Sequence, residues 1–163
     1  MDEEGRLLSD KAALRRLTTR LREEGKTIVT INGCFDILHS GHVGILQEAA
    51  RQGDILIVGL NSDASVRANK GEGRPILSQD QRAAILLALE PVDYVCVFEE
   101  IHCMAFIEAA RPHVHVNDAS YGENCVESET VRAVGARLHL APKQEGVSTT
   151  TFINRMRRAQ GQG

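Results

Sequence analysis

The sequence is poor in aromatic residues and has no tryptophan. Four Phe and two Tyr make up 4% of its 163 residues. Proteins that bind single-stranded nucleic acid stack bases on aromatic side chains, so this scarcity argues against such a surface. Nineteen Lys and Arg stand against 22 Asp and Glu, which gives a net charge of −3 and a pI near 6.1. Since nucleic-acid-binding domains carry a basic excess, we expect no nucleic-acid partner.

Long apolar runs are also missing. No run approaches the ~20 apolar residues that a membrane-spanning helix requires. The first residues, Met1 to Arg6, are polar and acidic, unlike a signal peptide. The four cysteines are Cys34, Cys96, Cys103 and Cys125. None of them forms a C-x-x-C pair, so the spacing signal of a zinc or redox site is absent. We therefore expect a cytoplasmic protein with reduced cysteines and no membrane contact.

Two familiar nucleotide-binding motifs are absent as well. Gly25-Lys26-Thr27 resembles the end of a phosphate-binding P-loop, but residue 20 is Arg where that motif needs Gly. The tripeptide also precedes a β-branched run, whereas a P-loop follows its strand. No G-x-G-x-x-G follows any expected strand, which removes the support for a nicotinamide or flavin dinucleotide fold.

What the sequence does contain is a regular alternation of strand and helix patterns. Strands are expected at residues 27–31, 55–60, 94–98, 114–116 and 137–140, and helices at 9–24, 41–52, 78–89, 101–110, 127–134 and from 148. Residues 69–75, rich in glycine and charge, are expected to form a flexible loop. The pattern predicts an α/β fold with a doubly wound, parallel, five-stranded sheet. Residues 1–25 would form an N-terminal helical extension, and residues 26–163 one domain.

The first expected strand leads into a motif with phosphate-binding chemistry. It reads Asn32-Gly33-Cys34-Phe35-Asp36-Ile37-Leu38-His39-Ser40-Gly41-His42. His39 and His42 are three residues apart, so at a helix start they project to the same side. Gly41 between them allows a ligand to approach the backbone closely. Because free N–H groups at a helix N-terminus favour an anion, the motif predicts a phosphate site.

This motif resembles the HxGH nucleotidyltransferase superfamily, in its cytidylyltransferase-like branch. Those enzymes join a nucleoside triphosphate to a phosphorylated small molecule and release pyrophosphate. Within the branch, residues 32–36, 61–66 and 70–75 are closely similar to adenylyltransferases that make ADP-heptose from heptose 1-phosphate, for lipopolysaccharide biosynthesis. The resemblance covers about residues 26–158. It implies a Rossmann-like nucleotidyltransferase domain over residues 26–163, ATP and a sugar phosphate as substrates, Mg²⁺ with the triphosphate, and a homodimer.

The resemblance also implies roles for individual residues. The residues expected to be catalytic are His39, His42, Lys70 and Arg82. The residues expected to bind the nucleotide are Asn32, Gly33, Cys34, Phe35, Gly41, Ser148 and Thr149. The residues expected to bind the sugar phosphate are Asp36, Asn61, Asp63, Arg74 and Asn117. No protein side chain is assigned as a metal ligand. ATP and a sugar phosphate bring about six negative charges together, so the cations in this set have an evident use.

One departure keeps alternatives open. Where the heptose enzymes typically read Val-Lys-Gly-Gly-Asp-Tyr, residues 116–121 read Val-Asn-Asp-Ala-Ser-Tyr, so Asn117 replaces a cation. Lys143 and residues 145–150 also resemble the cytidylyltransferases for phosphoalcohols such as glycerol 3-phosphate. A cytidylyltransferase and a non-catalytic nucleotide-binding sensor are therefore the alternative functions.

The remaining histidines are assigned to packing or to the surface. His113 and His115 alternate along an expected strand, with no acidic or cysteine partner at metal-ligand spacing. His102 and Cys103 are adjacent on an expected helix and are assigned a structural role.

Overall fold

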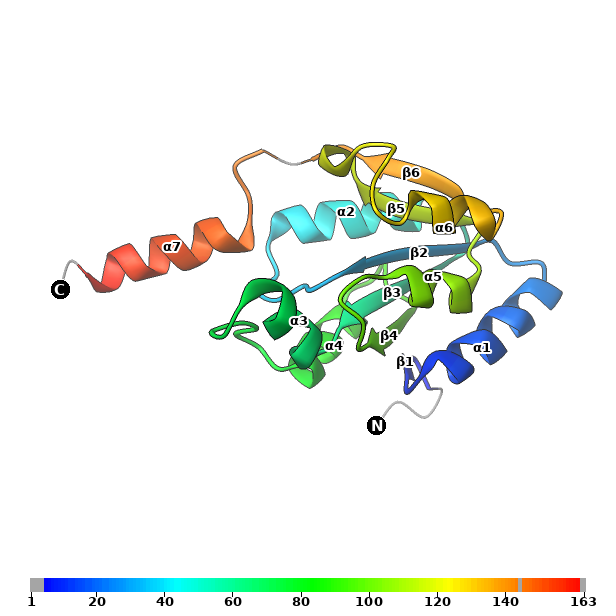
Figure 1. The fold of residues 1–163 in the computed structure, drawn as a ribbon, viewed down its shortest axis with the longest axis horizontal. Coiled ribbons are helices and arrows are strands. Elements are labelled where there is room, and N and C mark those ends of the chain that lie inside the picture. Colours follow the sequence, from blue (N-terminus) through cyan, green and yellow to red (C-terminus); the bar gives the residue numbers. More distant parts are fainter. Residues whose placement is uncertain (1–4, 144, 162–163) are drawn as a thin grey trace.

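A single parallel sheet forms the centre of the computed structural model, which describes residues 5–143 and 145–161 (Figure 1). The strands, in chain order, are β1 (Leu7–Leu8), β2 (Ile28–Gly33), β3 (Ile55–Asn61), β4 (Tyr94–Phe98), β5 (Val114–Asp118) and β6 (Arg137–Ala141). Their order across the sheet is β1-β4-β3-β2-β5-β6, and every pair is parallel. The prediction of a doubly wound parallel α/β sheet is confirmed. The sheet has six strands, however, where the sequence predicted five.

The additional strand is β1, within the segment expected to be only a helical extension. Leu7 pairs with Val95 and Leu8 with Cys96 of β4. Two residues are too few to show a strand periodicity, so pattern reasoning misses this element. The division at residue 25 stays a prediction, but β1 and the helix after it pack on the same sheet as the rest of the chain.

The helices form two layers over the sheet. They are α1 (Lys11–Glu23), α2 (Ser40–Ala50), α3 (Asp63–Lys70), α4 (Gln79–Leu87), α5 (Met104–Ala110), α6 (Ser128–Ala133) and α7 (Thr149–Gln160), with a 3₁₀ turn at Ala119–Tyr121. Val29 and Val58 point to the face covered by α2 and α4, whereas Ile28 and Ile57 point to the face covered by α1, α5 and α6. Strands buried on both faces explain the nearly continuous apolar runs of the sequence.

Helix α3 is a second element that the sequence analysis missed. Its cap is Ser62, whose hydroxyl accepts a hydrogen bond from the Ser65 N–H at 3.1 Å. The helix is only eight residues long and Val66 is its one buried large apolar residue, so the sequence offers a short and weak apolar pattern. Of the loop expected at residues 69–75, residues 69 and 70 form the end of α3, and only residues 71–75 lie outside a helix.

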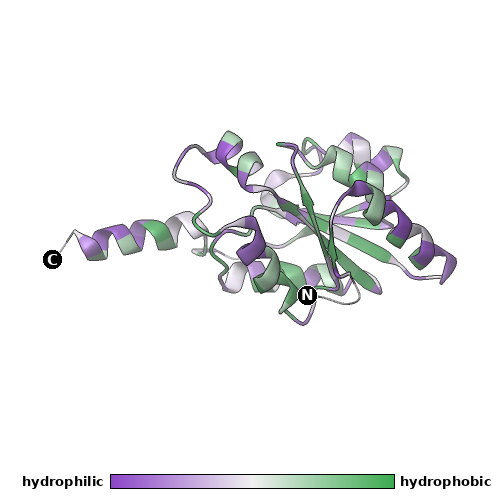
Figure 2. Ribbon diagram, turned by 90° about the horizontal axis from the view of Figure 1, so that it is seen from below, coloured by the Kyte–Doolittle hydropathy of each residue, from purple (hydrophilic) through white to green (hydrophobic). Residues whose placement is uncertain are grey.

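Helix α7 projects from the body of the molecule and has no buried residue (Figures 1 and 2). Figure 2 shows apolar strands in the centre and a largely polar α7 outside them. Ser148 caps its N-terminus by accepting from the Thr151 N–H at 3.1 Å. Among the described residues, no helix has the length and apolar character needed to cross a bilayer.

Candidate active site

The candidate site lies where β2 and β3 end at the carboxyl edge of the sheet, the usual ligand position in doubly wound folds. Residues 34–39 connect β2 to α2. Phe35 adopts a positive φ of 45° and is buried, and its ring lies 5.5 Å from the ring of His42. A Cβ atom at Gly33 would come within 3.0 Å of the Phe35 ring, so this packing requires glycine. Gly33 and Phe35 thus help to position His42.

His39 and His42 stack at the start of α2, with ring centroids 3.8 Å apart. His39 Nδ1 accepts a hydrogen bond from the Gly41 N–H at 3.1 Å, and His42 Nδ1 accepts one from the His39 N–H at 3.3 Å. A Cβ atom at Gly41 would lie 2.8 Å from the His39 ring, so glycine is required here too. Because both Nδ1 atoms accept, the hydrogen bonds assign the proton of each neutral ring to Nε2. Each ring therefore offers an Nε2–H donor.

Both imidazoles are neutral near pH 7. Burial, with smaller contributions from the proximity of His39 and Lys70, lowers the pKa of His42 to about 4. Burial also lowers the pKa of His39 below its ordinary value. Two neutral donors can bind a phosphate oxygen without repelling each other, as two imidazolium ions at this distance would.

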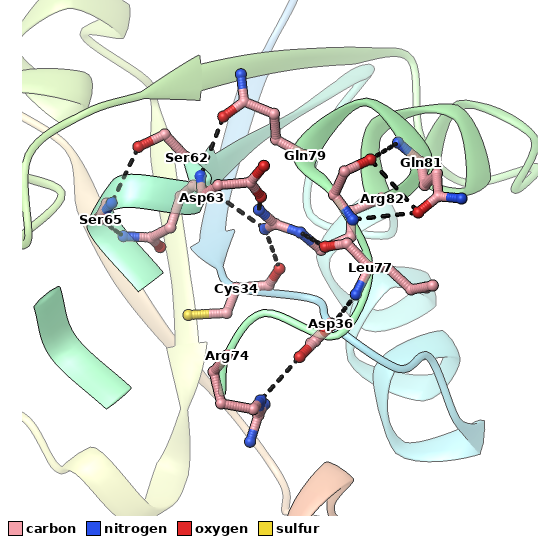
Figure 3. Close-up of polar contacts among 12 residues, drawn as sticks. Cys34, Asp36, Ser62, Asp63, Ser65, Arg74, Leu77, Gln79, Gln81 and Arg82 are labelled. Carbon is pink, nitrogen blue, oxygen red and sulfur yellow. Dashed lines mark hydrogen bonds and ion pairs between the residues drawn. The ribbon is translucent and has the colours of Figure 1, made fainter. Parts of the chain in front are cut away.

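The Asp36 side chain holds the loop before α4 against the β2–α2 turn (Figure 3). Its carboxylate accepts hydrogen bonds from the Ile76 N–H at 2.8 Å, the Leu77 N–H at 2.9 Å and the Arg74 Nε at 2.8 Å. Burial opposes ionisation of this carboxyl, but the hydrogen bonds from Leu77, Ile76 and Arg74 prevail and lower its pKa. The sequence assigned Asp36 and Arg74 to the sugar phosphate, whereas here they bind each other.

Arg82 is fully buried, although the sequence placed it beside the triphosphate. Its Nε donates to the Leu77 carbonyl at 3.0 Å, and its Nη1 donates to the carbonyls of Cys34 at 2.7 Å and Asn61 at 2.8 Å (Figure 3). Its Nη2 donates to Asp63 Oδ1 at 2.8 Å. The guanidinium thus joins the ends of β2 and β3 to α3 and α4. A triphosphate contact of Arg82 stays a prediction, but this geometry favours a positioning role.

Asn61 and Asp63 are likewise bound to protein groups. Asn61 Nδ2 donates to Ser65 Oγ at 2.8 Å, and the Asp63 N–H donates to Gln79 Oε1 at 3.0 Å. Asn117 is the next-to-last residue of β5, on the same edge of the sheet, and its Nδ2 donates to Glu127 Oε1. The amide donors of both asparagines are therefore engaged by protein acceptors, and a contact with the sugar phosphate stays a prediction.

The N-terminus of α7 lies beside the histidine pair. Thr149 Oγ1 donates to the Ile37 carbonyl at 3.1 Å, and the Phe152 ring lies 5.6 Å from the ring of His39. Ser148 caps this helix, so its hydroxyl and the first N–H groups of α7 lie next to the turn. The structure thus brings Ser148 and Thr149 to the HxGH motif from more than 100 residues away, and their binding of the nucleotide stays a prediction.

A cleft of about 240 Å³ separates α7 from the loop after α3. It is lined by Lys70, Gly71, Glu72, Gly73, Arg74, Ile76, Thr150, Ile153, Asn154 and Arg157. Arg74 is already paired with Asp36, so Lys70 and Arg157, on opposite walls, are the lining cations that suit a polyanion. Arg157 was missed by the sequence analysis because nothing in the α7 sequence distinguishes it from the neighbouring Arg155 and Arg158.

Family comparison agrees with this geometry. The cytidylyltransferase-like family matches residues 30–155, which include β2, the histidine pair and the start of α7. The chain belongs to the cytidylyltransferase-like family. Its Rossmann-like sheet and HxGH turn are therefore those of a nucleotidyltransferase family, as the resemblance implied.

Curated relatives of this cytidylyltransferase-like chain are named bifunctional protein HldE. The protein from Geobacter sulfurreducens is 46% identical over 142 residues, 86% of this chain and 29% of the relative. The protein from Syntrophotalea carbinolica is 45% identical over 147 residues, 90% of this chain and 30% of the relative. The chain thus spans about 30% of the length of these relatives.

Two solved structures share the fold of this cytidylyltransferase-like chain. The lipopolysaccharide core biosynthesis protein from Thermoplasma volcanium is 28% identical with a TM-score of 0.60, covering 74% of this chain and 98% of that one. Pantoate-beta-alanine ligase from Francisella tularensis has a TM-score of 0.65 at 13% identity, covering 85% and 67% of the two chains. At that identity the second likeness concerns the fold alone.

Proposed function

We propose that this protein transfers the adenylyl group of ATP to a sugar 1-phosphate, with heptose 1-phosphate as the leading substrate, and releases pyrophosphate. The observation that carries the proposal is the pair of Nε2–H donors on His39 and His42 at the N-terminus of α2. Relatives about 45% identical, named bifunctional protein HldE, support the choice of substrate.

The proposed reaction is a single in-line displacement. An oxygen of the sugar phosphate attacks the α-phosphorus of ATP, and the bond between that phosphorus and the oxygen bridging to the β-phosphate breaks. The imidazoles of His39 and His42 donate to the α-phosphate oxygens, where charge increases during the displacement. The attacking phosphate is already ionised near neutral pH, so the step needs no general base.

Pyrophosphate, the leaving group, would be held in the cleft between α7 and the loop after α3. Lys70 and Arg157 line that cleft, and the N-terminus of α7 presents Ser148 and Thr149 beside the histidines. Cations and free helix N–H groups stabilise the negative charge that the leaving oxygen gains. Arg82 would act through its bonds to Cys34 and Asn61, as a positioning residue.

The donor set of the site fits a metal ion that arrives with its nucleotide. Asp36 and Asp63, the carboxylates of the expected substrate set, are each paired with an arginine. A divalent ion, which enzymes of this kind generally use with the triphosphate, would therefore be held chiefly by phosphate oxygens and water. We propose Mg²⁺, which keeps several waters and neutralises phosphate charge.

A cytidylyltransferase for a phosphoalcohol is the second candidate, favoured by the likeness of Lys143 and residues 145–150 to those enzymes, whereas Asn117, where heptose enzymes typically carry Lys, favours a nucleotide-binding sensor. Pyrophosphate release should be measured with ATP, CTP and GTP, each against heptose 1-phosphate, other sugar 1-phosphates and glycerol 3-phosphate. We expect release with ATP and heptose 1-phosphate. Release only with CTP and glycerol 3-phosphate would favour the second candidate. Nucleotide binding without release from any pair would favour the sensor. The homodimer and the cytoplasmic location stay predictions.

A further inference from the structure

Three potential metal ligands converge inside the protein, away from the histidine pair. They are Cys103, His115 and Glu127, and one ligand atom from each lies within 4.8 Å of the other two. All three residues are buried, with exposed fractions of 4%, 0% and 5%. Burial of a thiol, an imidazole and a carboxylate in contact range is costly unless they bind each other or a shared ion.

His115 leaves one ring nitrogen without a partner. Its Nδ1 lies 2.8 Å from the hydroxyl oxygen of Thr30 on the neighbouring strand β2. Its Nε2 is buried and has no hydrogen-bond partner. Buried polar atoms in proteins are nearly always paired, so an unpaired Nε2 on a histidine of this group calls for a ligand.

Cys103 and Glu127 occupy helix ends that their side chains do not cap. Cys103 is the N-cap residue of α5 and Glu127 that of α6, and neither side chain accepts a capping hydrogen bond. Ser, Thr, Asp and Asn are the residues that N-cap positions prefer. Both side chains lie instead in the buried group with His115, so local helix structure does not account for their presence.

Hydrogen bonds from residues outside the group already orient His115 and Glu127. A metal-bound histidine usually donates its second ring N–H to an oxygen, which is the position that Thr30 holds beside Nδ1 of His115. Asn117 Nδ2 donates to Oε1 of Glu127 and fixes that carboxylate. Such outer partners are typical of protein metal sites and leave His115 Nε2 and a carboxylate oxygen for an ion.

We propose that Cys103, His115 and Glu127 bind a zinc ion. Thiolate, imidazole and carboxylate are all zinc ligands, and a thiolate disfavours Mg²⁺ or Ca²⁺, which prefer oxygen. The two negative charges of the thiolate and carboxylate balance Zn²⁺. On binding, the Cys103 thiol gives up its proton to water. Zinc here joins the starts of α5 and α6 to the middle of β5 and stabilises the carboxylate that holds Asn117.

The test begins with the unaltered protein. Full-length chain is stripped with a chelator and titrated with Zn²⁺, with Mg²⁺ as the control ion, and thermal unfolding is followed. We expect one tightly bound zinc per chain, a higher Tm with Zn²⁺ and no such shift with Mg²⁺. Co²⁺ in place of zinc should give a sulfur-to-metal charge-transfer band, which reports the thiolate directly.

Two variants locate the ion. Cys103→Ala should lose the charge-transfer band and bind zinc more than about tenfold more weakly. Cys96→Ala is the matched control, because Cys96 is also fully buried but lies on β4, outside the group. A His39→Ala/His42→Ala double variant tests whether the ion binds instead at the histidine pair of the candidate active site. This variant should retain the band.

Two results would overturn the proposal. One is a stripped wild-type protein that takes up no zinc, which needs no variant and so does not depend on how Cys103→Ala folds. The other is zinc binding that survives in Cys103→Ala and disappears in the His39→Ala/His42→Ala variant. Because these readouts are metal content, Tm and absorption, they are independent of pyrophosphate release and of the proposed function.

Discussion

The inner and outer halves of the candidate active site use charge in different ways. The inner half comprises Asp36, Asp63, Arg74 and Arg82, and the outer half His39, His42, Lys70 and the N-terminus of α7. In the inner half each carboxylate binds a guanidinium at 2.8 Å, so no charge is left without a partner. In the outer half, neutral imidazole donors stand beside a cationic cleft. The inner half should therefore determine stability, and the outer half should determine turnover.

The largest effect is expected from removing the central group of the inner half. Arg82→Ala deletes four hydrogen bonds and leaves Asp63 without its partner, so the free energy of unfolding should fall by about 3–5 kcal/mol. Denaturant unfolding measures it. Arg67→Ala is the control, because Arg67 is an exposed arginine on α3 and should cost less than about 0.5 kcal/mol. Unchanged stability with lost activity would instead place Arg82 on the triphosphate.

The outer half is tested by His42→Ala. Loss of one donor to the transition state should lower kcat/KM by about 10²–10³, with little change in the unfolding midpoint. His42→Gln, whose amide can place a donor near the position of Nε2, should recover part of the activity. His102→Ala provides the control, since His102 is exposed and distant in sequence from the motif. Activity of His42→Ala within a few-fold of the parent would contradict the proposed role.

The substitution Asp36→Asn tests the inner half with a smaller change than Arg82→Ala. Ile76, Leu77 and Arg74 all donate hydrogen bonds to the Asp36 carboxylate, and an amide has only one oxygen to accept them. The substitution should therefore lower the free energy of unfolding by about 1–3 kcal/mol. The lowered pKa of Asp36 means that its contribution is complete above the ordinary carboxyl pKa of about 3.9 and is lost as the pH falls through the lower folded value. Wild type and Asp36→Asn should therefore converge in stability only in strong acid; convergence at pH 6 would exclude this assignment.

The smallest effect is a pH dependence from the outer half. An unfolded His42 takes up a proton near pH 6.5, whereas the folded one, with its pKa near 4, does not. Stability from a neutral His42 is thus complete above pH 6.5 and declines as the pH falls toward 4. Denaturant midpoints of wild type and His42→Gln, compared from pH 7.5 to 5, should show the steeper decline in wild type. Parallel curves would mean that His42 is not held neutral.

Sequence reasoning succeeded where the information is local. Apolar runs located the five longer strands, and the helix expected from residue 78 is present as α4, which begins with a capping box between Ser78 and Gln81. The three-residue spacing of His39 and His42 predicted that their side chains project to the same side. What failed depends on tertiary contacts: β1 exists because β4 offers an edge, and α3 is held by capping and burial of Val66 more than by periodicity.

The direction of a long side chain is also a tertiary property. Arg82 was expected at the ligand, but the carbonyls that surround its guanidinium come from segments 5 to 48 residues away in the sequence. Cys103, His115 and Glu127 follow one another at intervals of twelve residues, which matches no metal-ligand motif. The expectation that His115 and Cys103 only pack was drawn from spacing, and spacing alone does not reveal which residues meet across a parallel sheet.

Strand β1 has a consequence for the tendency of the protein to aggregate. Without it, β4 (Tyr94–Phe98) would present an apolar edge with unpaired N–H and C=O groups, a template for edge-to-edge aggregation. Leu7 and Leu8 cover part of that edge, and Arg6 secures the cover by donating to the carbonyls of Asp93 and Val92. A fragment beginning at residue 26 would keep every residue of the HxGH site, yet it would expose this edge.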